Sequence, residues 1–362
     1  MYIVIFTSLL ALLLSYLESI GKMRNGMLYG FIMVTILSAI HYNYGNDYMS
    51  YYELYFQIVN QPFNWADIMS GVIYREPGWT LLNYVFSYFG GFLMLVAVLS
   101  VLQNVFIYRF IKKEVEKKWW GLSMFVYLFV TYFYLMSFTM MRQWFVACVF
   151  LGLWPLIKEK KWLLPLIIIF LCSYIHSSAR ILLPFAFYGF LPMRNSKVIA
   201  WTFAGVIIAL WIGGSWVNDL FGQTTAVTGL DRYTDVYGDQ EIKSTGRGVG
   251  FMLTIIPLFV GFHYLSGAEN LKEKKKALVL LSLIGFTINP LNDFFPMIGR
   301  LEVYFSIFQI ASVPLIYGYI KKENIQSALL MLYILVISYD YINFFSLWKS
   351  GFATFHTIFE VI

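Results

Sequence analysis

Apolar runs long enough to cross a lipid bilayer recur along almost the whole of the 362-residue chain. A single helix crosses the hydrocarbon core with about 20 apolar residues. Only 13% of the residues are charged, whereas soluble domains contain roughly 25%. We therefore expect one all-α, polytopic transmembrane domain over residues 1–362, embedded in the lipid bilayer. About twelve spans are predicted, at residues 2–20, 27–43, 92–111, 119–137, 139–157, 162–176, 178–191, 197–214, 249–266, 277–289, 297–319 and 325–343.

The basic residues fall unequally on the two sides that these spans define. Lysines dominate one set of connections, which includes Lys113 and Lys158, and the positive-inside rule assigns that set to the cytoplasm. Both ends of the chain are then expected outside. Most basic residues on the outer side are arginines: Arg75, Arg142, Arg180, Arg232, Arg247 and Arg300.

This contrast between arginine and lysine predicts an outward-facing anion site. A guanidinium offers a planar set of donors that suits bidentate contact with phosphate or carboxylate, whereas a lysine suffices as a topology charge. Arg142, Arg180 and Arg300 lie at or just inside predicted membrane ends, where an unpaired charge is costly. Each arginine could instead extend to the lipid headgroups or pair with a carboxylate.

An outer loop is expected at residues 43–91, and it begins with an aromatic segment. Aromatic residues at helical spacing from Tyr48 onward predict an amphipathic helix with one aromatic face. Such a face suits the membrane interface, and its tyrosines could also stack on sugars. Asp47 precedes this helix and is either its N-cap or a catalytic carboxylate.

The same loop is expected to end with a short outer or re-entrant helix before Gly90. Pro77 is placed to open this helix at its first position. Arg75 and Glu76 directly precede it. These adjacent charges either neutralise each other or form an anion ligand beside a base.

A polar segment, Cys172–Arg180, interrupts an apolar run from Trp162 to Leu191. The run is too long for one crossing and short for two, so its polar centre predicts a turn at one membrane face. The expected topology places His176 and Arg180 of this turn on the outer side. A further outer loop is predicted at 215–248, the longest polar stretch, which carries Arg232 and Arg247.

Several kinds of chemistry have no support in the sequence. The chain has no phosphate-binding glycine loop, and its four histidines have no metal-ligand spacing. Both cysteines lie in apolar segments, which argues against a disulfide or zinc framework. We expect no cofactor, no metal and no nucleic-acid partner.

Five motifs together resemble those of the EpsG family of exopolysaccharide membrane proteins, which is related to Wzy-type polymerases. The motifs, within a likeness that covers about residues 1–345, are Tyr44-Gly-Asn-Asp47-Tyr48, Arg75-Glu-Pro-Gly-Trp79, Met141-Arg142-Gln143, His176-Ser-Ser-Ala179 and Gly299-Arg300-Leu301. The resemblance implies a GT-C-like fold and a polysaccharide polymerase on the outer face of the bacterial cytoplasmic membrane. It also implies donor and acceptor oligosaccharides carried by undecaprenyl diphosphate, with a chain-length regulator as a candidate partner.

The residues fit that chemistry in two roles. Arginines can stabilise the charge that develops on a diphosphate leaving group, and a nearby base can deprotonate the acceptor hydroxyl. The candidates for the base are His176, Glu76 and Asp47. The candidates for substrate binding are Arg142, Arg180, Arg247, Arg300, Arg75, Arg232 and Tyr48.

Three other functions remain open at this point. A GT-C glycosyltransferase that uses a polyprenyl-phosphate sugar would share the fold. A membrane O-acyltransferase could use His176 as its base. A transporter of lipid-linked oligosaccharides would need charges along a path through the membrane interior, whereas the predicted charges gather at one face.

Overall fold

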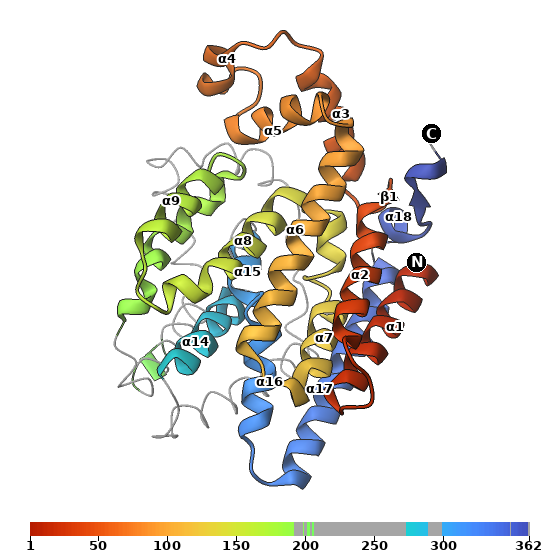
Figure 1. Cartoon of the computed structure of the whole chain (residues 1–362), viewed down its shortest axis with the longest axis vertical. Coiled ribbons are helices and arrows are strands. Elements are labelled where there is room, and N and C mark those ends of the chain that lie inside the picture. The colour runs from red at the N-terminus through yellow and green to blue at the C-terminus, as the bar shows by residue number, and fades with distance from the viewer. Residues whose placement is uncertain are drawn as a thin grey trace. The chain divides into compact units, whose positions relative to one another are not determined.

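The computed structural model describes residues 1–191, 273–288, 299–347 and 349–360, together with residues 198, 201, 202 and 205. Two compact units are present, one formed by Met1–Leu191 with Ile337–Ile362 and the other by Pro192–Val336. The described residues are mostly helical (Figure 1). Apart from those four single positions, the predicted spans at 197–214 and 249–266 and the predicted loop at 215–248 lie outside the described residues.

The first unit consists of helices with short connections. Its α-helices are α1 (Tyr2–Ser19), α2 (Gly26–Ala39), α3 (Tyr48–Val59), α4 (Trp65–Ser70), α5 (Pro77–Ser87), α6 (Gly91–Glu114), α7 (Trp120–Phe129), α8 (Met141–Ile157), α9 (Leu163–Cys172) and α18 (Lys349–Phe352). Its 3-10 helices are η1 (Lys117–Trp119), η2 (Leu135–Phe138), η3 (Ser177–Phe190) and η5 (Ile358–Glu360). Two short strands, β1 (His41–Tyr42) and β2 (His356–Thr357), pair antiparallel.

The second unit contains α14 (Glu273–Ile288), α15 (Gly299–Ser306), α16 (Gln309–Tyr319) and most of α17 (Glu323–Leu347), whose last residues belong to the first unit. The prediction of one continuous helix at 297–319 is wrong, because α15 and α16 are separate. At the break the backbone N–H of Phe308 donates to the carbonyl three residues earlier, as in a 3-10 turn.

Three of the described helices are long and apolar enough to cross a membrane: α1, α6 and α17. The 24 residues of α6 extend about 36 Å, at about 1.5 Å per residue. The apolar helices α2, α8 and α9 are shorter. The structure thus agrees with a helical membrane protein, whereas the total of twelve spans and the GT-C-like arrangement stay predictions.

The loop at 43–91 contains both predicted helices and a further one, α4. The aromatic face of α3 packs on the start of α6, where the rings of Tyr48 and Tyr55 lie 5.6 and 5.7 Å from that of Phe92. Pro77 occupies the first turn of α5, where its missing N–H is not needed. Gly90 and Gly91 have φ values of 86° and 73°, which favour glycine, and they turn the chain into α6.

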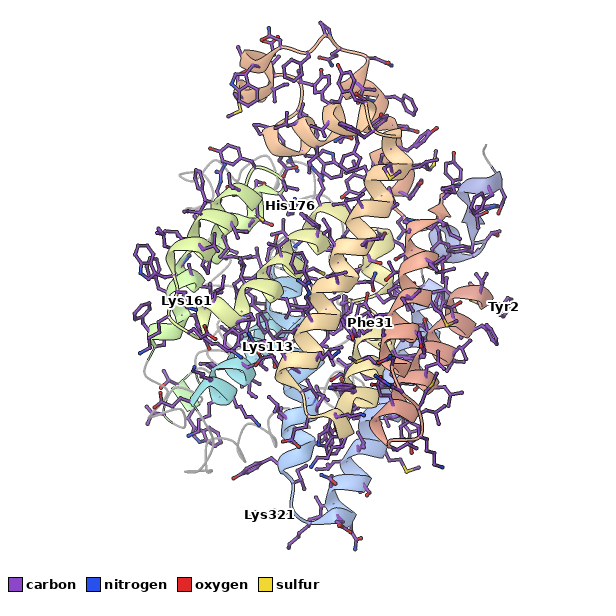
Figure 2. All side chains as sticks on the ribbon, viewed as in Figure 1. Tyr2, Phe31, Lys113, Lys161, His176 and Lys321 are labelled. Carbon is purple, nitrogen blue, oxygen red and sulfur yellow. The ribbon has the colours of Figure 1, made fainter. Side chains whose placement is uncertain are left out.

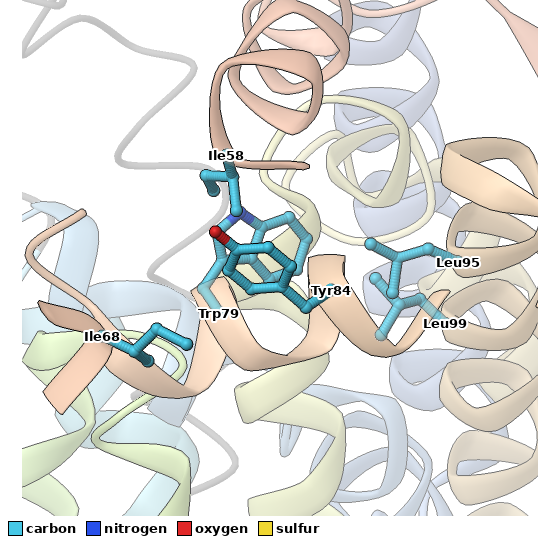
Figure 3. Close-up of a cluster of buried hydrophobic side chains, with 6 residues drawn as sticks. All are labelled: Ile58, Ile68, Trp79, Tyr84, Leu95 and Leu99. Carbon is cyan, nitrogen blue, oxygen red and sulfur yellow. The ribbon is translucent and has the colours of Figure 1, made fainter. Parts of the chain in front are cut away.

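A cluster of buried apolar side chains fixes α3, α4 and α5 against α6. Figure 3 shows its members, which come from all four helices: Ile58, Ile68, Trp79, Tyr84, Leu95 and Leu99. The three short helices gather at the end of α6 where that helix begins (Figure 1). This packing gives the first residues of α5 a defined position, although they lie in a loop.

The predicted span at 119–137 is wrong in its second half, because α7 ends at Phe129. A β-branched residue, Thr131, follows shortly after, and such residues have a lower helix propensity. The Thr131 hydroxyl donates to the Asp340 carboxylate of α17 at 3.1 Å. The chain then folds through η2 before α8 begins.

The polar segment after α9 is a turn, as predicted. α8 and α9 run in opposite directions, so the turn at Ser173–His176, which follows α9, lies beside the start of α8. The predicted α-helical span at 178–191 is instead the 3-10 helix η3, which contains Pro184, a residue without a backbone N–H. Gly189 near the end of η3 lies so close to Ile157 that a Cβ there would overlap the Ile157 carbonyl.

Residues 349–360 return to the segment that precedes α3. Besides the pairing of β1 with β2, the N–H of Gly45 donates to the carbonyl of Gly351 at 2.8 Å. The N–H of Ile358 donates to the carbonyl of Ile40 at 2.9 Å. The terminal amine of Met1 also donates to the carbonyl of Ala353 at 3.2 Å, so the first residue and the segment 349–360 meet within the first unit (Figure 1).

Candidate functional site

A buried ion pair joins the start of α5 to the start of α8. Glu76 directly precedes α5, and its Oε2 accepts a hydrogen bond from Nη1 of Arg142, the second residue of α8. Glu76 is 1% exposed and Arg142 is 8% exposed. Charged side chains are almost never buried to this degree unless they are paired.

The other carboxylate oxygen of Glu76 faces the turn between α9 and η3. Oε1 accepts a hydrogen bond from the backbone N–H of Ser177 at 2.9 Å, and Nδ1 of His176 lies 3.3 Å away. Glu76 therefore connects three segments that are far apart in the sequence: the start of α5, the start of α8 and the polar turn.

Backbone docking explains why α5 and the polar turn meet. The N–H groups of Gly78 and Trp79, in the first turn of α5, donate to the carbonyl of Tyr174 at 2.9 and 3.3 Å. Groups at a helix start have no partner within the helix, so the Tyr174 carbonyl satisfies them. Gly78 permits this approach, because a Cβ there would lie 2.9 Å from the carbonyl carbon of Tyr174.

Three aromatic side chains enclose the Arg142 guanidinium. Its Cζ lies 5.2 Å from the ring centroid of Tyr51, 5.3 Å from that of Tyr74 and 5.6 Å from that of Trp79. Ring faces attract a cation at such distances. Nη1 also donates to the Tyr74 hydroxyl at 2.8 Å.

Two donors of this enclosure are buried without a hydrogen-bond partner in the described part of the chain: Nε of Arg142 and Nε1 of Trp79. Buried donors are normally satisfied, and each one left unmet costs about 1–3 kcal/mol. Arg142 also lies in the first turn of α8, at the positive end of the helix dipole, where a cation is disfavoured and an anion is stabilised. Both features suit a ligand that is rich in negatively charged acceptors.

Opposing influences set the pKa of the Glu76 carboxyl. Burial is the largest and raises the pKa, but the hydrogen bond to His176, the charge of Arg142 and the N–H of Ser177 together outweigh it. The resulting pKa is about 2, below the ordinary value of 4.5. Glu76 is therefore ionised at neutral pH and only weakly basic.

Stability toward acid should report this ion pair. A carboxyl whose pKa is lower in the folded state stabilises the protein above about pH 4.5 and loses that contribution as the pH falls toward 2. We expect the Tm of the detergent-solubilised protein to stay level from about pH 7 to about pH 5 and to fall below about pH 4.5. The Glu76→Gln variant should show a smaller fall. Thermal unfolding followed by tryptophan fluorescence measures both proteins, and equal falls would contradict the assignment.

The lysines lie at the other end of the helices that carry the site. Lys113 is in the last turn of α6, and Lys158, which follows α8, pairs with Glu114 at the end of α6. α8 has 17 residues, so its ends are about 25 Å apart. Figure 2 shows Lys113 and Lys161 apart from His176. The predicted separation of arginine and lysine is therefore present along α8, whereas which end faces the cytoplasm stays a prediction.

The other predicted site residues in the first unit lie outside this cluster. Asp47 is exposed at the N-cap position of α3, and its side chain makes no capping hydrogen bond. Tyr48 is fully buried, so its predicted contact with substrate would require α3 to move. Arg75 and Arg180 are exposed.

The remaining predicted arginines are spread over other parts of the chain. Arg300 lies in the first turn of α15, in the second unit, and its side chain is outside the described set. Arg232 and Arg247 lie outside the described residues altogether. The roles predicted for these three residues stay predictions.

The aromatic enclosure and the partner of Glu76 were not predicted. The sequence placed Arg75 beside Glu76, whereas the ion pair in the structure joins Glu76 to Arg142, 66 residues further along. Tyr74 and Trp79 flank Arg75 and Glu76 in the sequence, but the cation that they enclose is Arg142, far along the chain, so no local pattern signals the enclosure.

This arrangement can bind an anion through Arg142 and can hold a proton between Glu76 and His176. The described residues contain no group of three or more His, Cys, Asp or Glu side chains that could hold a metal ion. The chemistry that the guanidinium of Arg142, the carboxylate of Glu76 and the imidazole of His176 can supply is charge stabilisation and proton transfer.

Comparison with known proteins identifies a family whose model matches the chain. The model of the EpsG family matches residues 26–355, which include α2 through α9 and the whole candidate site. No curated protein matches the chain, and no solved structure matches it.

Proposed function

The chain belongs to the EpsG family, a family of Wzy-type polymerases, and on that premise we propose that it joins oligosaccharide repeat units carried by undecaprenyl diphosphate. The growing glycan would be transferred from its lipid carrier to a hydroxyl of the next lipid-linked unit. The reaction would take place at the outer face of the cytoplasmic membrane, and both donor and acceptor would be lipid-linked oligosaccharides.

The cluster of Glu76, Arg142 and His176 is the observation that carries this proposal. In the transfer, the acceptor oxygen attacks the anomeric carbon of the donor, and the bond from that carbon to the diphosphate oxygen breaks. The electron pair of the broken bond goes to the diphosphate, whose developing charge Arg142 stabilises. Removal of one such donor from an enzyme site typically lowers the rate by about 100-fold to 1,000-fold.

The proton of the acceptor hydroxyl goes to the pair formed by Glu76 and His176. Glu76 contacts both His176 and Arg142, so a base and an anion ligand stand side by side, as the transfer requires. Asp47 is the N-cap residue of α3, and α3 carries Tyr51, which covers Arg142. Because of this placement Asp47 remains a third candidate for the base.

The distribution of charge supports an outward-facing site. The cluster lies at the end of α8 opposite to Lys158, and the lysine-rich end is the one that the positive-inside rule assigns to the cytoplasm. Repeat units displayed on the outer leaflet would then lie on the same side of the membrane as Arg142.

Reconstitution tests the function. The purified protein in liposomes, supplied with undecaprenyl-diphosphate repeat units, should convert them into a ladder of longer glycans. Addition of a single sugar from a polyprenyl-phosphate donor would point to a GT-C monomer transferase. Unchanged glycans moved to the other leaflet would point to a transporter. Either outcome would contradict the polymerase.

His176→Ala should lower the polymerisation rate by about 100-fold to 10,000-fold, the usual contribution of a positioned acid–base group. His176 lies in the turn between α9 and η3 and not within an apolar helix, so its removal should leave membrane insertion intact. The glycan ladder on a gel and the amount of protein in the membrane fraction measure the two effects. Wild-type chain length from this variant would assign His176 a structural role.

A further inference from the structure

Resting on the function proposed above, we propose that donor binding switches Glu76 on as the base. The diphosphate replaces Glu76 as the partner of Arg142, and the released Oε2 accepts the proton of the attacking hydroxyl. In the free protein the ion pair would hold both groups in a resting state.

The contacts of Arg142 favour such an exchange. Nη1 serves two acceptors at once, Oε2 of Glu76 and the Tyr74 hydroxyl, while Nε is buried without a partner in the described part of the chain. Nε1 of the neighbouring Trp79 is likewise buried without a hydrogen-bond partner among the described residues. A diphosphate brings several charged oxygens, and bidentate contacts between guanidinium and phosphate are among the strongest hydrogen bonds. The diphosphate can therefore accept hydrogen bonds from Nε of Arg142 and Nε1 of Trp79, which the single oxygen of Glu76 does not reach.

The contacts of Glu76 decide which atom is released. Oε1 stays in place, because it is held by the backbone N–H of Ser177 at 2.9 Å and by His176 at 3.3 Å. Only Oε2 loses its partner when Arg142 turns to the diphosphate. The carboxylate then keeps its orientation and presents one oxygen on the side where Arg142 holds the leaving group.

The surroundings of Glu76 make this oxygen basic after the exchange. Among the described residues, the groups that face the carboxyl are Arg142 of α8, His176 of the polar turn and Ser177 at the start of η3. Burial raises its pKa, and Arg142 is one of the groups that hold it near 2. When the charge of Arg142 is neutralised by a diphosphate, that pKa rises, and the negative charge of the diphosphate raises it further.

The step balances with the groups that the reaction supplies. The acceptor O–H bond breaks and its proton forms a bond to Oε2 of Glu76. The acceptor oxygen forms the new glycosidic bond as the diphosphate departs with its electron pair. When the diphosphate leaves, Arg142 returns to Glu76, and the proton passes to water.

Infrared spectroscopy with geranyl diphosphate as a probe tests the switch without turnover. The purified protein, labelled with ¹³C-glutamate, is titrated between about pH 4 and about pH 6 with and without the probe. With the probe, we expect a protonated carboxyl band from Glu76, which corresponds to a rise of about two pH units, or about 100-fold, in proton affinity. Without the probe, Glu76 should give no such band.

Two variants assign the band and serve as controls. Glu76→Asp keeps a carboxylate for Arg142 and should fold, but its band is not shifted by the ¹³C label. Glu114→Gln removes the carboxylate that pairs with Lys158 at the far end of α8 and should leave the probe-induced band unchanged.

The outcomes separate the two proposals. Binding of the probe is measured independently by calorimetry. Failure of the probe to bind would overturn the diphosphate site and with it the proposed function. Binding with Glu76 still ionised throughout would overturn the switch alone and leave the diphosphate site in place.

Discussion

Arg142→Lys should lower kcat/KM for polymerisation by about 100-fold to 1,000-fold while the protein remains folded in the membrane. Lysine keeps a positive charge for Glu76, so the buried carboxylate retains a counter-ion. It loses the planar fork of donors with which Arg142 contacts Glu76 and Tyr74 and with which it can bind a diphosphate in a bidentate manner. Polymerisation of lipid-linked repeat units in liposomes measures the rate, and the glycan ladder shows the chain length.

Arg109→Lys is the matched control for this change. Arg109 lies in the second half of α6 and is exposed. The same substitution there should leave the polymerisation rate within about two-fold of wild type, as expected for a surface charge that keeps its sign. A normal rate in Arg142→Lys, or an equal loss in both variants, would argue against a specific role of the Arg142 guanidinium.

Glu76→Gln should destabilise the protein by about 3–5 kcal/mol, the usual cost of removing one partner from a buried ion pair. Arg142 would be left 8% exposed without its counter-charge, and its place in the first turn of α8 adds to the cost. Unfolding in detergent by a graded denaturant measures the free energy. The same variant should also lose polymerisation, since it lacks a carboxylate base.

The double variant Glu76→Gln/Arg142→Met separates charge from packing. Removal of both charges should recover most of the lost stability, because no buried charge remains unpaired. It should not recover activity. If the double variant is as unstable as Glu76→Gln alone, the loss comes from packing around the carboxylate and not from the unpaired arginine.

Much of the fold near the site could be predicted because the signals are local. The aromatic spacing from Tyr48 onward marked α3, and Pro77 marked the start of α5. The polar interruption in the run from Trp162 to Leu191 marked the turn that carries His176. Each of these signals lies within a few residues of the structure that it specifies.

The differences from the predicted fold arise where tertiary contacts decide the backbone. An apolar composition does not distinguish α-helix from 3-10 helix, so η3 was expected to be an ordinary span. The end of α7 at Phe129 leaves Thr131 to bond Asp340, more than 200 residues away, and no local pattern reports such a contact.

The site itself could be predicted in part. The expected topology placed Arg142 and His176 on one face, and the structure brings both to Glu76. The alternative that an outer arginine pairs with a carboxylate also holds for Arg142. The pairing of Glu76 with Arg142, rather than with the adjacent Arg75, depends on how α5 docks on the turn through Tyr174. That docking joins residues far apart in the chain, so no local sequence pattern predicts it.

The contact between residues 349–360 and the segment before α3 has a consequence for biosynthesis. The backbone hydrogen-bond partners of Gly45 and Ile40 are Gly351 and Ile358, which the ribosome adds more than 300 residues later. During translation the segment that leads into α3 therefore lacks these hydrogen bonds while the intervening helices are made. α3 carries Tyr51, which covers Arg142, so the candidate site would reach its final form only after nearly the whole chain has been synthesised.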